Sequence, residues 1–203
     1  MAGEGEQGEH TVELRTVRLT EDIVLRPSTT ADAEALARAH DRSRAHLGPW
    51  DPRRPPEFFT TAGQLALLRA YEQERAEGQR ARWLLWDESG AGAGDAPVVA
   101  GGIALSQIVR GPLHSANLGY WTDVGYAGRG LATAAVTAVC AAADADLRLH
   151  RLEAGTLLHN AASQRVLAKC GFTEYGLAPA YLHINGAWQD HRLFQRILND
   201  REP

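Results

Sequence analysis

The chain is poor in cysteine. Only Cys140 and Cys170 occur among its 203 residues, which excludes the dense disulfide framework of small secreted domains. Both lie on the apolar face of a segment with helical periodicity. We therefore expect two buried free thiols in a protein of a reducing compartment.

A long hydrophobic run is also missing. No stretch approaches the roughly 20 apolar residues that a membrane-spanning helix needs. The first residues, Met1 to His10, are polar and acidic, unlike a secretory signal peptide. We expect a cytoplasmic protein without a membrane partner, in which residues 1–16 form a disordered extension.

Neither sign of charge dominates the chain. Lys and Arg number 21 against 25 Asp and Glu, which gives a net charge of −4. This balance argues against nucleic acid as a partner, because binding to phosphates needs a basic surface. It is compatible with a basic peptide or an amine. No His, Cys and Asp residues have the spacing of metal ligands, so we expect no metal.

A glycine-rich turn, Gly128-Arg129-Gly130, precedes a segment with a well-marked helical pattern. The N–H groups of a first helical turn have no internal partner, and the helix dipole adds partial positive charge there. The turn therefore predicts a site for a phosphate-bearing cofactor. The competing interpretation is a tight turn before a packed helix. No Gly-Lys-Ser/Thr follows, and Thr133 replaces the third glycine of a dinucleotide fingerprint. The apolar positions of the helix are Val136, Val139, Cys140, Ala143 and Leu147.

A second helix is predicted from Asn160 to Gly171. Asn160 is a good N-cap residue and Gly171 stands where a glycine ends a helix. Val166, Leu167 and Cys170 form its apolar stripe. Ser163 follows Asn160 by three positions, so both side chains lie on one side of the helix start. They either cap the helix or hold a ligand.

The remaining pattern mixes strands and helices in a single domain. We expect a helix from Thr29 or Thr30 to about His46, a proline-rich loop over Leu47–Pro56, and a helix to about Glu77 that begins with a capping box of Thr61 and Gln64. The expected strands are Ile23–Arg26, Arg82–Asp87, Val98–Ser106, Ser115–Asp123, Leu149–Thr156, Thr173–Ile184 and Trp188–Leu198, the last two joined at Asn185-Gly186.

The two glycine-containing segments together resemble the GNAT acetyltransferase superfamily, in its RimJ/RimL-like branch of ribosomal-protein-alanine N-acetyltransferases. The resemblance covers roughly residues 17–198 and includes Leu25-Arg26-Pro27, Leu118 to Trp121, and Ile184 to His191. It implies an α+β, three-layer α/β/α fold. The sheet would be mixed and mostly antiparallel, and it would splay between two central parallel strands, Ser115–Asp123 and Leu149–Thr156. The domain would comprise residues 17–198, with 199–203 as a tail.

The resemblance implies transfer of the acetyl group of acetyl-CoA directly to a primary amine. The acceptor would be the N-terminal α-amine of a protein such as a ribosomal protein, of the Ala or Ser type. The alternatives are a small-molecule amine and a non-catalytic CoA-binding paralogue. A homodimer is compatible with the resemblance. The positions that it assigns to CoA are Trp121, Thr122, Asp123, Ala127, Gly128, Arg129, Gly130, Leu131, Ala132, Thr133, Asn160 and Ser163.

Three positions depart from the family pattern. Ala127 stands in place of a leading Gln or Arg, Leu167 in place of a Tyr that protonates the thiol, and Asn117 in place of a Glu. Ser163 matches a serine that takes the place of this Tyr in the branch, so it is our candidate for the acid that protonates the leaving thiol. The alternative is that its hydroxyl bonds only to the backbone of its own helix. A backbone N–H near Trp121 or Thr122 is the expected donor to the thioester oxygen.

The general base is open. Glu153 is one candidate, and its alternative role is an ion pair with Arg151 or Arg148. His159, His183 and His191 are others, and an ordered water chain would also serve. Family analogy places Trp50 and Tyr181 beside the acceptor channel, although a Trp can equally fill a core.

Overall fold

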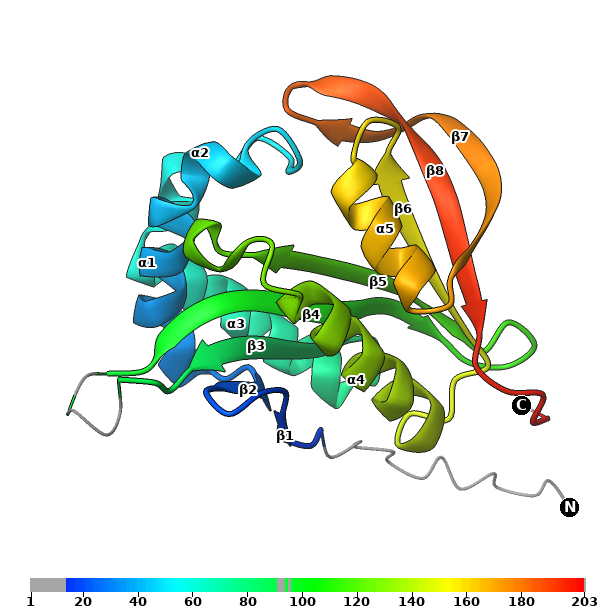
Figure 1. Cartoon of the computed structure of the whole chain (residues 1–203), viewed down its shortest axis with the longest axis horizontal. Coiled ribbons are helices and arrows are strands. Elements are labelled where there is room, and N and C mark those ends of the chain that lie inside the picture. Colours follow the sequence, from blue (N-terminus) through cyan, green and yellow to red (C-terminus); the bar gives the residue numbers. More distant parts are fainter. Residues whose placement is uncertain (1–13, 91–93, 95, 203) are drawn as a thin grey trace, which may run out of the picture.

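The computed structural model describes residues 14–90, 94 and 96–202. It contains one mixed eight-stranded sheet, in the order β1-β2-β3-β4-β5-β6-β8-β7 (Figure 1). The strands are β1 (Val17–Arg18), β2 (Ile23–Pro27), β3 (Ala81–Asp87), β4 (Val98–Val109), β5 (Ser115–Thr122), β6 (Arg151–Leu157), β7 (Thr173–Ile184) and β8 (Ala187–Ile197). The helices are α1 (Ala33–Arg42), α2 (Arg44–Leu47), α3 (Thr61–Ala76), α4 (Leu131–Ala145) and α5 (Ala161–Lys169).

Helices cover both faces of the sheet, α1 and α3 on one face and α4 and α5 on the other (Figure 1). Strand β3 shows why. Trp83 and Leu85 belong to the core that α4 covers, whereas Leu84 and Trp86 belong to the core that α1 and α3 cover. Successive side chains of a strand point to opposite faces, so a strand buried on both reads as one apolar run. The expected three-layer α+β fold is confirmed.

The parallel strands β5 and β6 pair along only part of their length. Residues Ser115–Asn117 pair with Arg151–Glu153, and every other neighbouring pair in the sheet is antiparallel. Beyond this point β5 stays with β4 as far as Thr122, while β6 stays with β8 as far as Leu157. The sheet is therefore splayed, as expected, and a gap opens between β5 and β6.

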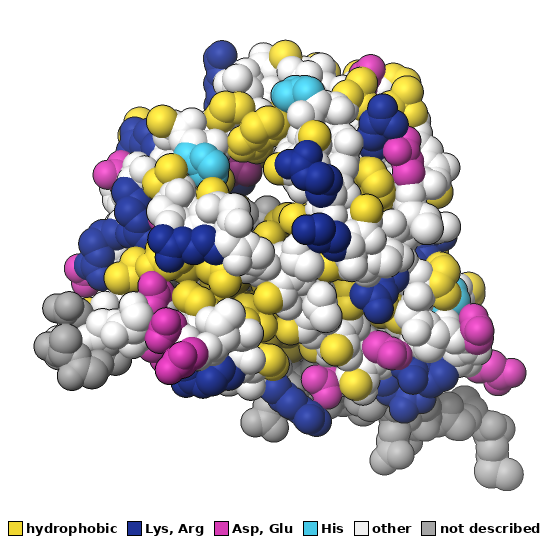
Figure 2. Space-filling view, in the orientation of Figure 1, with side chains coloured by type: hydrophobic (Ala, Val, Ile, Leu, Met, Phe, Trp, Pro, Cys, Tyr) yellow, Lys and Arg dark blue, Asp and Glu magenta, His cyan; other side chains and the backbone are white. Residues whose placement is uncertain are grey.

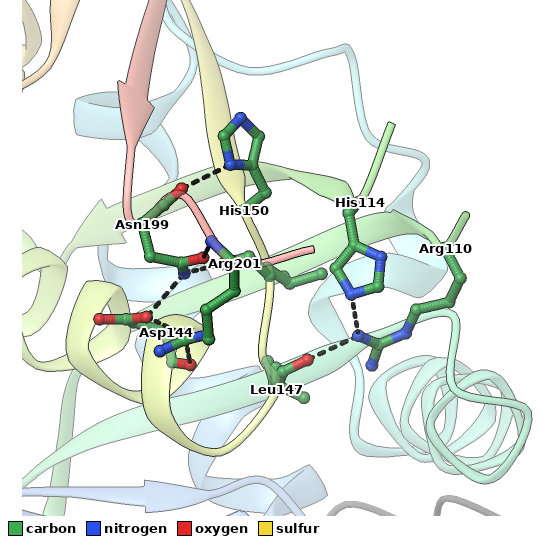
Figure 3. Close-up of polar contacts among 8 residues, drawn as sticks. Arg110, His114, Asp144, Leu147, His150, Asn199 and Arg201 are labelled. Atoms are coloured by element: carbon green, nitrogen blue, oxygen red, sulfur yellow. Dashed lines mark hydrogen bonds and ion pairs between the residues drawn. The ribbon is translucent and has the colours of Figure 1, made fainter. Parts of the chain in front are cut away.

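The C-terminal tail stabilises the end of this gap at which β5 and β6 still pair (Figure 3). Asn199 Nδ2 donates to Asp144 Oδ1 (2.7 Å) and to the Leu149 carbonyl (2.9 Å), and His150 Nδ1 lies 2.6 Å from the Asn199 carbonyl oxygen. The tail thereby joins the end of α4 to the start of β6. The limits expected for the domain, residues 17 and 198, stay a prediction, and residues 1–13 of the expected extension lie outside the described residues.

The first long helix is interrupted at Ser43. We expected it to continue to about His46, but α1 ends at Arg42 and α2 is a separate short helix. Ser43 is buried, and its hydroxyl donates to Asp123 (2.7 Å) and accepts from the Val124 N–H (3.2 Å). These contacts with the segment after β5 hold Ser43 outside regular helical geometry.

The capping box predicted for Thr61 and Gln64 is wrong. Thr60 caps α3, because its Oγ1 accepts from the Gly63 N–H (3.1 Å). Gln64 is buried, and its amide donates to the Phe58 carbonyl. The Thr-Thr pair permitted either register, and the packing of Gln64 under the preceding turn selects the earlier one.

Two other expectations concern the cysteines and membrane-spanning helices. Cys140 and Cys170 are buried and free, as predicted. In the described part of the chain, no helix has the length and apolar character required to cross a membrane.

Candidate active site

The glycine turn before α4 requires its glycines. Gly128 and Gly130 both have φ of 78°, the left-handed region that costs other residues roughly 1–2 kcal/mol. A Cβ at either position would meet nothing within 4 Å, so this side of the turn is open. The backbone conformation therefore favours glycine, and the free space leaves room for a ligand.

The N-terminus of α4 has the properties of an anion site. The first helical bond runs from the Ala134 N–H to the Gly130 carbonyl (3.1 Å). In residues 14–90 and 96–202, no acceptor receives the N–H groups of Leu131, Ala132 or Thr133. The helix dipole adds partial positive charge at this end, so these residues fit the pyrophosphate of CoA. Ala127 and Arg129 are exposed beside them, and the Arg129 guanidinium lies over the Tyr126 ring.

The start of α5 is tied to β5 by a pair of hydroxyl groups. Asn160 caps the helix, because its Oδ1 accepts from the Ser163 N–H (3.1 Å). Ser163 Oγ lies 2.8 Å from the Tyr120 hydroxyl, which also donates to the Ser163 carbonyl (3.2 Å). Burial raises the pKa of Tyr120 to about 12, so the phenol is neutral. The sequence motif Leu118 to Trp121 contains Tyr120, but its partner could not be inferred from spacing.

Strand geometry decides which backbone N–H groups face the gap. The Asp123 N–H donates to the Ala100 carbonyl of β4 (2.9 Å). In an antiparallel ladder the direction of the N–H alternates along the strand, so the Trp121 N–H also faces β4. The N–H groups of Tyr120 and Thr122 face the opposite side, where β6 has diverged. Of the two expected oxyanion donors, Thr122 is the one that faces the gap.

Asp123 has its carboxylate engaged within the protein. The side chain is buried, forms an ion pair with Arg42 (Nε to Oδ2, 2.7 Å), and accepts from Ser43 Oγ (2.7 Å) and from the Gly125 N–H (3.0 Å). It thus joins the end of α1 to the turn that leads into α4. Its geometry is that of a support for the turn that precedes α4.

A cavity of about 300 Å³ lies on the face of the sheet that is opposite to α4 and α5, between β4, β5 and the helices α1 and α3. We call it the acceptor cavity, after the role that we propose for it below. His40 lines it, stacked between Phe58 (centroids 4.8 Å apart) and Trp121 (4.4 Å). Burial, with the charges of Arg82 and Arg54, lowers the pKa of His40 to about 3, so its imidazole is neutral. The other ionisable residues whose side chains line the cavity are Asp51, Arg54, Tyr71, Arg80 and Arg82.

Asp51 is a carboxylate of the acceptor cavity that the sequence did not single out. Burial raises its pKa, and Arg54, whose Nη2 lies 3.4 Å from Asp51 Oδ2, opposes this rise. The residue lies in the proline-rich loop, next to the candidate Trp50. No local pattern distinguishes it, because its role depends on where the loop folds.

The loop around Trp50 crosses the open end of the gap. The Trp50 ring lies 5.4 Å from the His159 ring, between β6 and α5. The Asp51 carbonyl accepts from the Asn185 N–H (3.0 Å) in the β7–β8 turn. Trp50 therefore borders the gap, and it remains 37% exposed. Figure 2 shows the α4–α5 face hollowed near its centre, with Lys or Arg side chains along one edge.

Tyr181 lies on the β6 side of the gap. Its ring is 5.5 Å from that of His191, and it passes close to Gly155, where a Cβ would meet it at 3.6 Å. His191 is buried and its Nδ1 lies 2.9 Å from the Gln189 carbonyl. The His183 and Trp188 rings meet edge to face near the tip of the hairpin, with centroids 5.5 Å apart.

Glu153 lies opposite Asn117 in the parallel register. It forms an ion pair with Arg151 and accepts from the Tyr175 hydroxyl (3.3 Å). These contacts match the structural alternative given for Glu153, and it is not among the residues that line the acceptor cavity. Among the described residues, no group of three or more His, Cys, Asp or Glu could hold a metal ion.

Known proteins share this architecture. The family model of the acetyltransferase (GNAT) domain matches residues 22–173. The [Ribosomal protein uS5]-alanine N-acetyltransferase of Escherichia coli (strain K12) is 33% identical over 188 residues, which cover 92% of this chain and 94% of the relative.

Two solved structures extend the comparison. The ribosomal-protein-S5-alanine acetyltransferase from Vibrio fischeri superposes with a TM-score of 0.86 at 31% identity, covering 93% of this chain and all of that one. Mycobacterium smegmatis RimJ in complex with CoA-disulfide gives a TM-score of 0.78 at 29% identity, covering 86% and 81%. The chain belongs to the GNAT acetyltransferase family and is an acetyl-CoA-dependent N-acetyltransferase.

Proposed function

We propose that this protein transfers the acetyl group of acetyl-CoA to the N-terminal α-amine of a protein, such as a ribosomal protein that begins with Ala or Ser. One observation carries the proposal. The anion site at α4 and the acceptor cavity lie on opposite faces of the sheet, and both reach β5 where it has left β6. Two substrates can therefore meet at this point from opposite sides. The named relatives, which are ribosomal-protein acetyltransferases, support this acceptor class.

The residues of the α4 turn would hold the cofactor. The N–H groups of Leu131, Ala132 and Thr133 would donate to the pyrophosphate, and Asn160 would offer its side-chain amide to the pantetheine arm. Acetyl-CoA supplies the thioester whose acyl carbon the amine attacks. The Thr122 N–H, which faces the gap, is placed to donate to the carbonyl oxygen as negative charge develops.

Asp51 is placed to accept the proton of the amine. An α-amine has an ordinary pKa of about 7.7–8.0, so near pH 7 a modest base suffices to make it neutral. Asp51 lines the acceptor cavity with a raised pKa, which makes it a stronger base than an ordinary carboxylate. Glu153 and the three histidines named above have protein partners and lie outside this cavity.

Ser163 is placed to hydrogen-bond the sulfur as the thiol leaves. Its hydroxyl is held by Tyr120 at 2.8 Å, so the pair could pass a proton while both groups remain neutral at rest. Trp50 and Tyr181 border the path of the acceptor. Because ribosomal proteins are synthesised in the cytoplasm, this function places the protein there.

A small-molecule amine is the second candidate acceptor. The volume of about 300 Å³ lies at the lower end of the range for small-ligand sites, so such an amine would fit without a protein attached.

The test is the release of thiol from acetyl-CoA with a panel of acceptors. The panel contains peptides that begin with Ala or Ser, the same peptides with a blocked N-terminus, and small amines. Turnover of the free peptides alone is expected. Turnover of small amines alone would refute the peptide acceptor, and turnover of no member of the panel would refute both acceptor classes.

A further inference from the structure

Arg82 stands in the acceptor cavity without a hydrogen-bonded carboxylate among the described residues. It projects from β3 into the lining, and its Nη1 atom is fully buried without a hydrogen-bond partner among the described residues. A buried cation without a partner is unfavourable, so structural reasons alone do not account for an arginine here.

The other arginines of the cavity are already paired. Arg54 lies 3.4 Å from Asp51, and Arg80 forms an ion pair with Glu74. The cavity therefore has a negative pole at Asp51, partly offset by Arg54, and an uncompensated positive pole at Arg82.

The surroundings of Arg82 hold its guanidinium without neutralising it. The Tyr71 ring lies 5.0 Å from the Arg82 Cζ atom, which favours the cation through its π face. Asp32 is the carboxylate whose charge reaches Arg82, but its oxygens are engaged by Arg26 (2.8 Å) and by the Thr29 N–H (2.8 Å). Burial lowers the pKa of Arg82, yet an arginine stays protonated in proteins.

We propose that the acceptor carries a carboxylate that binds Arg82 while its amine lies near Asp51. This inference rests on the proposed acetyltransferase function and specifies its substrate class. The planar guanidinium of an arginine suits a carboxylate because it offers several N–H donors in one fork. The carboxylate can come from an Asp or Glu near the N-terminus of a peptide, or from a small amine that is also an acid.

The first experiment compares acceptors that differ only in this charge. One arm uses peptides beginning with Ala that carry Glu or Gln at each of the next few positions. The other arm uses amino acids and their amides. We expect the acidic acceptor to have a kcat/KM about 10- to 100-fold above that of the matching amide, which is the range of a charge-assisted hydrogen bond. This preference should occur either at one peptide position or in the small-molecule arm. The arm that shows the preference identifies the source.

Variants of Arg82 test the residue itself. Arg82→Met keeps the packing against Tyr71 without the charge, so the ratio of kcat/KM for the acid to kcat/KM for its amide should fall to about one. Arg82→Lys should restore part of the preference. Arg69→Met, which removes an exposed charge from the same helix as Tyr71, is the matched control and should preserve the preference.

The outcomes separate this inference from the proposed function. Equal turnover of acids and amides by the unaltered enzyme would overturn the role of Arg82 and leave the acetyltransferase function standing. If no acceptor is turned over, the proposed function fails, and calorimetric titration of the same acceptors into CoA-loaded protein decides the inference. Equal binding of acid and amide, or binding of neither, would overturn it.

Discussion

The bridge between Tyr120 and Ser163 gives a sharp prediction. Tyr120→Phe removes one hydroxyl and leaves the ring in place. That hydroxyl contacts Ser163 Oγ at 2.8 Å and the Ser163 carbonyl at 3.2 Å. A neutral hydrogen bond contributes about 0.5–1.5 kcal/mol, so the variant should lose about 1–2 kcal/mol of unfolding free energy. Ser163→Ala should lose about 1 kcal/mol by the same reasoning.

The double variant should lose less than the sum, because both substitutions break the same contact. We expect a coupling of about 1 kcal/mol in urea unfolding followed by tryptophan fluorescence. Each single variant should also lower kcat, while the Kd for CoA from calorimetry stays close to that of the unaltered protein. Tyr175→Phe is the control, since that hydroxyl contacts Glu153 (3.3 Å) outside the acceptor cavity. Strict additivity to within about 0.3 kcal/mol, or an unchanged kcat in both single variants, would refute the bridge and its role.

Three further predictions follow from the site. Gly130→Ala places a Cβ at φ of 78° and should weaken CoA binding in calorimetry. Gly111→Ala, at φ of 70° in a distant turn, is the control and should leave the Kd for CoA unchanged. Equal effects of the two variants on this Kd would contradict the anion site. Asp51→Asn should lower kcat about 100-fold or more. Because Asp51 acts as a base only when ionised and its pKa is raised, kcat should fall as pH drops through that pKa, and the variant should lack this acidic limb; a retained limb would assign it to another group. Asp123→Ala leaves Ser43 and the Gly125 N–H without their acceptor. In urea unfolding it should cost about 3 kcal/mol, near the low end for a buried ion pair because Arg42 can turn to solvent. A loss below about 1 kcal/mol would show that Asp123 is not a support.

The sequence predicted elements whose signals are local. The glycine turn, the cap at Asn160 and the glycine at 171 depend on backbone conformation within a few residues, so they are visible without tertiary structure. The splay between β5 and β6 followed from the family resemblance. The boundary at Ser43 was not visible, because the hydroxyl that ends the helix acts through Asp123, which lies 80 positions away in the chain.

The acceptor cavity was harder to predict for the same reason. Its ionisable groups come from the loop at Asp51, from helix α1 at His40 and from strand β3 at Arg82. Each looks ordinary in its own segment, since a single Asp, His or Arg carries no periodic signal. Only the packing of α1 and the loop over the sheet gives His40 its lowered pKa and leaves Arg82 without a partner.

The contact between Asp51 and Asn185 makes the gap a closed ring. The ring runs from β5 through Asp123 to the end of α1, along the loop to Asp51, across to the β7–β8 turn, and back through β8 and β6 to the parallel pairing. A polypeptide cannot be laid into a closed ring from the side; it has to be threaded by a free end. The enzyme could thus distinguish a chain terminus from an internal segment by topology, before any side chain of the acceptor is recognised, and release of the product would be the same threading in reverse.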